Sequence, residues 1–166
     1  EAVNILNLSE DEIIVNVQGD EPFIEVEVVE AVINRVKQIK ENNEDIMITS
    51  CYKEISSSLA DDPNHVKVVL DEHSNAIYFS RAKVPYHRDH HENATYSGHL
   101  GIYGFTKKSL NAFCKLPSSK LENIEKLEQL RAIDNGHKIA MVKVVSKSFG
   151  IDTQEDLNNA IKIFGK

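Results

Sequence analysis

Apolar and polar residues follow one another along the chain in short blocks whose period changes several times. The β-branched apolar run at 13–17 is too short for a helix and stops at the breaker 19–22, so it predicts a buried strand that ends in a loop. Over 25–41 the apolar residues recur at helical spacing with charged residues between them, which predicts a helix packed on a sheet. The residues before 13 are typical of the end of a helix followed by a polar turn.

The same alternation continues to the end of the chain. Strands are predicted at 46–51, 66–70, 76–79, 100–105 and 139–145, helices at 107–114, 121–135 and 153–164, and a Ser-rich helix or loop at 56–62. The connection between the strands at 66–70 and 76–79 has the length and composition of a hairpin. Gly101 and Gly104 permit close approach of another backbone, and Gly136 is placed to end a helix in the left-handed conformation.

Strands that alternate with helices predict one α/β domain over residues 1–166, an open sheet with helices on both faces. In such sheets ligands bind beyond the carboxyl ends of the strands. The stretch 81–98 has no apolar period, and a loop of this length in a compact domain is usually functional or disordered.

Charge and composition narrow the class of protein. The 166 residues carry a formal net charge of −7, and the basic residues form no stripe of the kind that binds nucleic acid or an anionic membrane. No apolar run approaches the length of a membrane span. Cys51 and Cys114 lie far apart without metal or redox spacing, which suits a reducing, cytoplasmic compartment.

Two acidic loops are candidates for a cation site. Asp20 follows the strand at 13–17, where an α/β protein places its active site, and Asp152 follows the last predicted strand. Both aspartates follow the carboxyl ends of predicted strands, so the fold could bring them to one rim and make a cation site there, since Mg²⁺ takes one or two carboxylates from a protein. Each aspartate also has an ordinary explanation, since Asp20 can cap a Gly-Asp turn and Asp152 can cap the helix at 153–164.

Other polar residues stand in less regular surroundings. Arg81 and Arg88 offer planar forks for carboxylate or phosphate, although most such arginines form surface ion pairs. Four histidines could suggest a zinc site: His87, His90, His91 and His99. Their spacing is interrupted and no cysteine accompanies them, so a solvated loop is the better interpretation. Periodicity over 121–135 gives a buried stripe at Ile124, Leu127, Leu130 and Ile133, and leaves Glu128 and Gln129 either solvated or facing a ligand. The chain contains neither of the common glycine-rich phosphate-binding motifs.

Taken together, five segments resemble one family. VNVQGDEP at 15–22, YFSRAKVPYHRD at 78–89, HLGIYGF at 99–105, IEKLEQLRAIDNG at 124–136 and GIDTQEDL at 150–157 are similar to segments of the 3-deoxy-manno-octulosonate cytidylyltransferases (CMP-Kdo synthetases), in the family's order and approximate spacing. The resemblance implies a Rossmann-like open mixed sheet of the nucleotide-diphospho-sugar transferase type. It also implies a cytoplasmic homodimer that couples CTP to the acidic sugar Kdo, releases pyrophosphate and gives CMP-Kdo for lipopolysaccharide synthesis.

Matching positions give the residue roles that the resemblance implies. Asp20 and Asp152 would be the catalytic Mg²⁺ ligands, and the region 81–96 would contribute to the dimer contact. The residues implied to hold the sugar acid are Gln18, Arg81, His99, Tyr103, Glu128 and Gln129.

The resemblance begins partway into the family's pattern. The family's front strand and its Gly- and basic-rich CTP loop have no counterpart here, so we expect an N-terminally truncated chain, the C-terminal part of a cytidylyltransferase, with little activity alone. The alternatives are a cytidylyltransferase for another sugar acid, such as sialic acid, and an inactive dimerisation fragment.

Overall fold

A single mixed sheet organises the chain. The computed structural model describes residues 2–19, 21–89, 94–148, 150–151 and 154–164. Its strands are β1 (Ile13–Val17), β2 (Ile48–Ser56), β3 (Lys67–Leu70), β4 (Ala76–Ser80), β5 (Thr95–Thr106) and β6 (Ile139–Lys143). The order across the sheet is β4-β3-β5-β2-β6, and β1 lies off this path, paired with residues 102–106 of β5. This confirms the predicted open mixed sheet.

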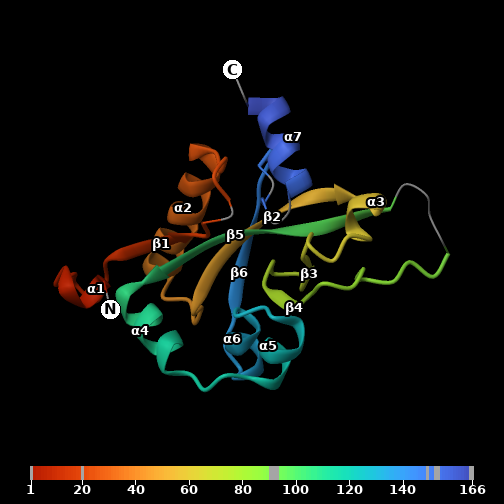
Figure 1. Ribbon diagram of the computed structural model, residues 1–166. Coiled ribbons are helices and arrows are strands. Elements are labelled where there is room, and N and C mark those ends of the chain that lie inside the picture. The colour runs from red at the N-terminus through yellow and green to blue at the C-terminus, as the bar shows by residue number, and fades with distance from the viewer. Residues whose placement is uncertain (1, 20, 90–93, 149, 152–153, 165–166) are drawn as a thin grey trace.

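Helices cover both faces, as predicted. Figure 1 shows α2 (Val26–Asn42) and α7 (Gln154–Phe164) above the sheet, and α4 (Lys107–Lys115), α5 (Lys120–Glu125) and α6 (Leu130–Asp134) below it. Short helices α1 (Ala2–Ile5) and α3 (Ser57–Ala60) complete the described elements. No helix among the described residues is long and apolar enough to cross a membrane.

Each face of the sheet has its own core. Under α2 the buried residues include Val28, Val32, Leu100 and Ile102. On the other face Phe79, Phe105 and Leu130 belong to a second cluster, to which α4, α5 and α6 contribute. At Gly104 an added Cβ would lie 2.7 Å from the Val32 side chain, so the helix can come this close only to glycine.

Strand direction places two loops at one edge. β1 and β2 both run antiparallel to β5, and β6 runs parallel to β2. β1, β2 and β6 therefore point the same way, and the loops that follow β1 and β6 leave from the same edge of the sheet. This is the rim at which the acidic loops were expected to meet.

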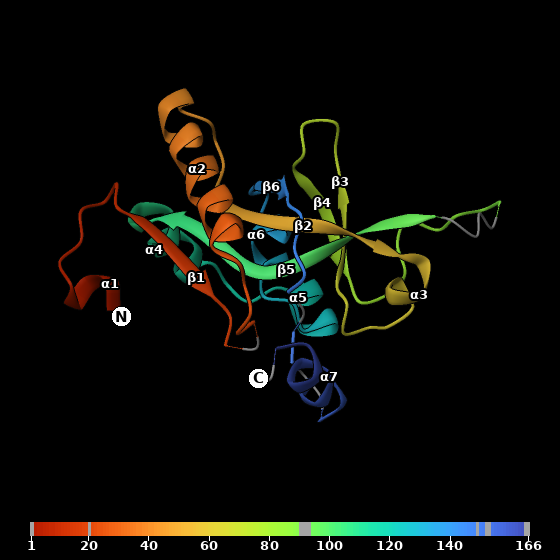
Figure 2. The ribbon, with the colours of Figure 1, turned by 90° about the horizontal axis from the view of Figure 1, so that it is seen from above.

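The longest strand differs from its prediction. β5 begins at Thr95 rather than at residue 100, and residues 95–98 belong to it instead of to an irregular loop. Buried and more exposed residues alternate through it, but Ser97 and Gly98 carry no bulk that would show this in the sequence. Figure 2 shows β5 running the length of the sheet. β2 is likewise longer than 46–51, and β6 ends at Lys143, leaving Val145 exposed.

The predicted helix at 121–135 is wrong as a single element. α5 stops at Glu125, Lys126 adopts the left-handed conformation with φ of 55°, and α6 starts only at Leu130. The helical phase is therefore reset, so Leu127 and Leu130 are buried but Ile124 is 66% exposed. Gly136, with φ of 79°, follows the end of α6 in the predicted left-handed conformation.

Candidate active site

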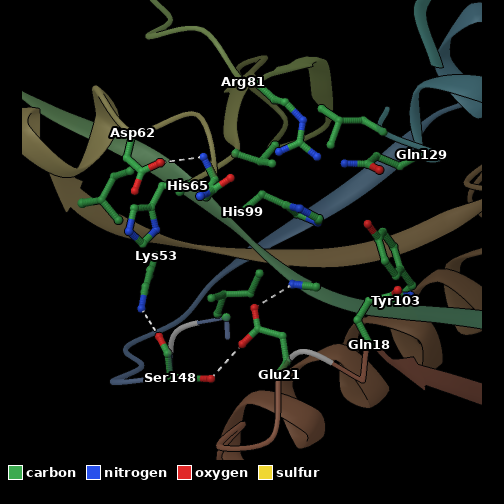
Figure 3. A pocket seen from close by; sticks show the side chains of 18 of the residues that line it. Gln18, Glu21, Lys53, Asp62, His65, Arg81, His99, Tyr103, Gln129 and Ser148 are labelled. Carbon is green, nitrogen blue, oxygen red and sulfur yellow. Dashed lines mark hydrogen bonds between the residues drawn. The ribbon is translucent and has the colours of Figure 1, made fainter. Parts of the chain in front are cut away.

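A polar pocket lies at the edge of the sheet where β1 and β6 end. Its volume is about 430 Å³, and its walls come from the β1 loop, β2, the middle of β5, the α5–α6 connection and the loop after β6. In Figure 3 the side chains of Arg81, His99 and Gln129 are directed into the same space from different elements. Residues far apart in the sequence thus meet around one cavity.

The two loops at this edge are tied to each other. Glu21 is buried, and its carboxylate accepts a hydrogen bond from the Ser148 hydroxyl at 2.8 Å and one from the Gly101 backbone N–H at 3.3 Å. Glu25 accepts from the Ser146 hydroxyl at 2.6 Å and from the Lys147 backbone N–H at 2.7 Å. These contacts fix the described parts of both loops at the pocket, and Figure 3 shows the contact between Glu21 and Ser148.

A lysine on β2 supplies positive charge next to the two joined loops. Lys53 donates to the backbone carbonyl of Ser148 (Figure 3). Burial lowers the pKa of the Lys53 ammonium, and the charges of Glu21 and Glu25 act against this shift. Lys53 therefore lies beside both loops and near the carboxylates of Glu21 and Glu25, which belong to the loop after β1.

Hydrogen bonds hold both the side chain and the backbone of Arg81. Its Nε donates to the backbone carbonyl of Glu125 at 2.8 Å, and its Nη1 donates to that of Pro63 at 3.1 Å. Its backbone N–H donates to the Glu125 carboxylate at 3.0 Å, while Lys67, fully buried, donates to its carbonyl at 2.6 Å. The guanidinium thus enters the pocket wall in a fixed orientation, suited to a carboxylate or phosphate.

His99 lies between two aromatic rings. The ring meets Phe79 edge-on at a centroid distance of 5.0 Å and Tyr103 at 5.5 Å. Its Nε2 is 2.9 Å from the hydroxyl of Ser50. Burial lowers the pKa of His99 to about 3, so the imidazole is neutral at physiological pH.

Gln129 has an unused donor. The residue is 4% exposed, and its Nε2 is buried without a hydrogen-bond partner, the only such side-chain atom among the described residues. A buried amide donor without a partner costs about 1–3 kcal/mol, which a bound acceptor would recover. Glu128 beside it is exposed and also lines the pocket.

All the residues implied to hold the sugar acid line this pocket: Gln18, Arg81, His99, Tyr103, Glu128 and Gln129. Arg88 is exposed and is not part of the wall. Asp20 and Asp152 lie outside the described residues, as do His90 and His91. Over the described part of the chain, no three His, Cys, Asp or Glu side chains gather as a metal cluster.

Several pocket residues gave no signal in the sequence. Lys53 lies on β2 and Ser148 in the loop after β6, and both line the pocket only because the sheet brings these two segments to it. Glu125 was treated as one residue of a long helix, although its carboxylate fixes Arg81. Glu21 differs from these, because it follows a predicted buried strand in the same loop as Asp20, and the structure places its side chain against Gly101.

Within the described residues of segment 81–96, Lys83 contacts Ser57 of α3. Lys83 donates to both carboxylate oxygens of Asp61 at 2.9 and 3.0 Å and lies 5.4 Å from the ring centre of Tyr96. Tyr86 is 75% exposed. The described part of the segment therefore has a fixed base and an exposed aromatic residue.

Comparison with known proteins shows which family the chain resembles. A family model described as cytidylyltransferase matches residues 1–139. The 3-deoxy-manno-octulosonate cytidylyltransferase of Wolinella succinogenes is 54% identical, with 99% of this chain and 68% of the relative covered. That of Helicobacter pylori is 50% identical, with 99% and 66% covered.

A solved structure agrees with these relatives. CMP:2-keto-3-deoxy-manno-octonic acid synthetase complexed with CTP superposes with a TM-score of 0.82 at 33% identity, over 98% of this chain and 65% of that chain. The chain spans about two thirds of the length of the proteins it matches.

Proposed function

Because the chain belongs to the cytidylyltransferase family, among the 3-deoxy-manno-octulosonate cytidylyltransferases, we propose that the whole protein transfers CMP from CTP to Kdo. The products are pyrophosphate and CMP-Kdo, which serves lipopolysaccharide synthesis. The observation that carries the proposal is the pocket in which Arg81, His99 and Gln129 converge.

The pocket has the chemistry that an acidic, polyhydroxylated sugar requires. Arg81 is oriented for a carboxylate, and the unpaired Gln129 amide is ready to donate to a sugar oxygen. The chain has a net charge of −7, so an anionic substrate must be neutralised locally. Lys53 and Lys126, which line the same pocket, add two further cationic side chains.

We further propose that Asp20 and Asp152 hold Mg²⁺. The described residues beside them support a common site, because Glu21 and Ser148 are hydrogen bonded and both line the pocket. Carboxylate oxygens are hard donors of the kind that this ion takes. When bound, Mg²⁺ would neutralise charge between sugar and triphosphate and lower the pKa of the attacking hydroxyl.

The main task of the protein in this reaction is to position the two substrates. A sugar hydroxyl oxygen forms a bond to the α-phosphorus of CTP, the bond from that phosphorus to the pyrophosphate oxygen breaks, and the hydroxyl proton passes to solvent water. Arg81 and Gln129 would fix the sugar so that its hydroxyl points at the phosphorus. Such alignment can supply much of the rate in phosphoryl transfer.

Pyrophosphate release by the whole protein tests this function. We expect release that depends on CTP and Kdo together, with N-acetylneuraminate a poor substrate and a poor competitor. Preference for N-acetylneuraminate would reassign the sugar. No release with either sugar acid, together with no CTP binding in calorimetry of both the chain and the whole protein, would instead favour a non-catalytic dimerisation module.

We also propose a cytoplasmic homodimer in which segment 81–96 meets its counterpart. The exposed Tyr86 on an arm anchored through Lys83 and Asp61 supports this surface. Sedimentation equilibrium should give twice the mass of one chain for the whole protein and a lower mass for Tyr86→Asp. A monomer at micromolar concentration would contradict the dimer.

A further inference from the structure

Ser50, a residue of the central part of the sheet, contacts the pocket residue His99. It lies on β2, is completely buried, and its hydroxyl oxygen is 2.9 Å from Nε2 of His99. The same hydroxyl is 2.8 Å from the backbone carbonyl of Ile102, to which it donates. Both contacts join β2 to β5 at the back of the pocket.

The number of protons on each group determines the direction of the two hydrogen bonds of Ser50. A serine hydroxyl has a single proton, and a carbonyl oxygen can only accept, so the Ser50 proton goes to Ile102. The Ser50 oxygen is then left as an acceptor toward His99. The imidazole must therefore carry a proton on Nε2 to make this contact.

A neutral imidazole has one N–H, and burial keeps this ring neutral. With the proton on Nε2, Nδ1 has a free lone pair and no proton. Most of the ring is enclosed by its neighbours, but His99 keeps some exposed surface where it lines the pocket, and within the described residues its Nδ1 has no hydrogen-bond partner. It is also not among the buried unpaired atoms, so it is open to the pocket.

We propose that Ser50 is a positioning residue that fixes the His99 tautomer, so that Nδ1 faces the substrate as an obligate hydrogen-bond acceptor. The group that it takes is a donor, a sugar hydroxyl, and not a carboxylate. The nature of that substrate rests on the proposed function, whereas the tautomer does not. Gln129 then supplies the complementary donor, and Arg81 the fork for the acid group.

The tautomer can be read directly by ¹⁵N NMR of histidine-labelled whole protein, with His99 assigned by its loss in His99→Asn. We expect a protonated Nε2 and an unprotonated Nδ1 at neutral pH. A protonated Nδ1, or a doubly protonated ring, overturns the proposal without any need for a Ser50 variant. This result does not depend on whether the protein turns over CTP.

Variants test the role of the hydroxyl. Ser50→Ala should allow the Nδ1–H tautomer to become populated and raise the KM for Kdo roughly five-fold, the worth of one hydrogen bond, with little change in the KM for CTP. Ser50→Thr keeps a hydroxyl and should restore both readouts. An unchanged tautomer in Ser50→Ala would overturn the role of Ser50.

A matched control lies next in sequence. Thr49 is also buried on β2, but its side chain is directed to the opposite face, against Gly104. Thr49→Val removes a hydroxyl from the neighbouring buried position and should leave the His99 tautomer and the sugar KM unchanged. If it changes the tautomer as much as Ser50→Ala does, the effect is one of general packing and the proposal fails. Absence of all turnover with the expected tautomer would count against the proposed function only.

Discussion

Removing the Glu125 carboxylate should loosen Arg81 and weaken the site in a measurable way. This carboxylate accepts hydrogen bonds from the Ser80 hydroxyl at 2.8 Å, the Arg81 backbone N–H at 3.0 Å and the Tyr78 hydroxyl at 3.4 Å. Burial alone would raise the pKa of Glu125, but these donors and the Arg81 charge lower it. The Glu125 carboxylate is therefore ionised at neutral pH and accepts all three of these hydrogen bonds.

The magnitude follows from which donors can find another partner. In Glu125→Ala the two hydroxyls can rotate, but the Arg81 backbone N–H has a fixed direction and is left unpaired. A hydrogen bond to a charged group contributes about 1.5–3 kcal/mol, and Glu125 is only partly buried, so we expect a loss of about 2 kcal/mol in the free energy of unfolding. In Glu125→Gln the amide oxygen can still accept from that N–H, and the loss should be about 1 kcal/mol.

Urea denaturation measures the free energy of unfolding of the whole protein, thermal denaturation its Tm, and steady-state kinetics the effect on the site. Glu125→Ala should lower Tm by about 4–8 °C and raise the KM for Kdo about ten-fold, because 1.4 kcal/mol of lost orientation corresponds to a factor of ten. Glu72→Ala, in the exposed β3–β4 turn, is the control and should change neither quantity. A stability change below about 0.5 kcal/mol together with an unchanged sugar KM would refute the reasoning.

Three further predictions concern the metal, the sugar and acid stability. Asp20→Asn and Asp152→Asn should each lower kcat at saturating Mg²⁺ by about two orders of magnitude or more without a change in Tm; near-wild-type rates would remove the metal assignment. Glu128→Ala should raise the KM for Kdo more than the KM for CTP, and equal effects would take this residue out of the sugar site. The hydrogen bonds from Arg131 lower the pKa of Glu122 to about 2, so its stabilising effect is complete above about pH 4.5 and is lost as the pH falls toward 2. Glu122→Gln should therefore flatten the acid limb of stability against pH, and a limb as steep as in the wild type would contradict this.

Much of the fold could be predicted because its signals are local. The apolar spacing of Val28, Val32 and Val36 suffices for α2, whose buried face is the predicted one. The rim that joins the loops after β1 and β6 could also be expected, since strands that run the same way end on the same edge. Family resemblance then singled out pocket residues that no local pattern distinguishes.

What the sequence could not show depends on tertiary contacts or on backbone conformations without a compositional signal. Lys126 is left-handed although it is not glycine, so nothing in the apolar period announces the break between α5 and α6. The bond from Ser148 to Glu21 joins residues 127 positions apart. The proton count at Ser50 likewise requires both of its partners, His99 and Ile102, which only the sheet brings together.

A crystal structure of the whole protein with Kdo tests the central claim most directly, that this pocket is built for an acidic sugar. The account predicts the sugar carboxylate against the Arg81 guanidinium, a sugar oxygen within hydrogen-bond distance of Gln129 Nε2, and a hydroxyl against His99 Nδ1. Kdo bound away from these side chains, with the Gln129 amide still unpaired, would contradict it.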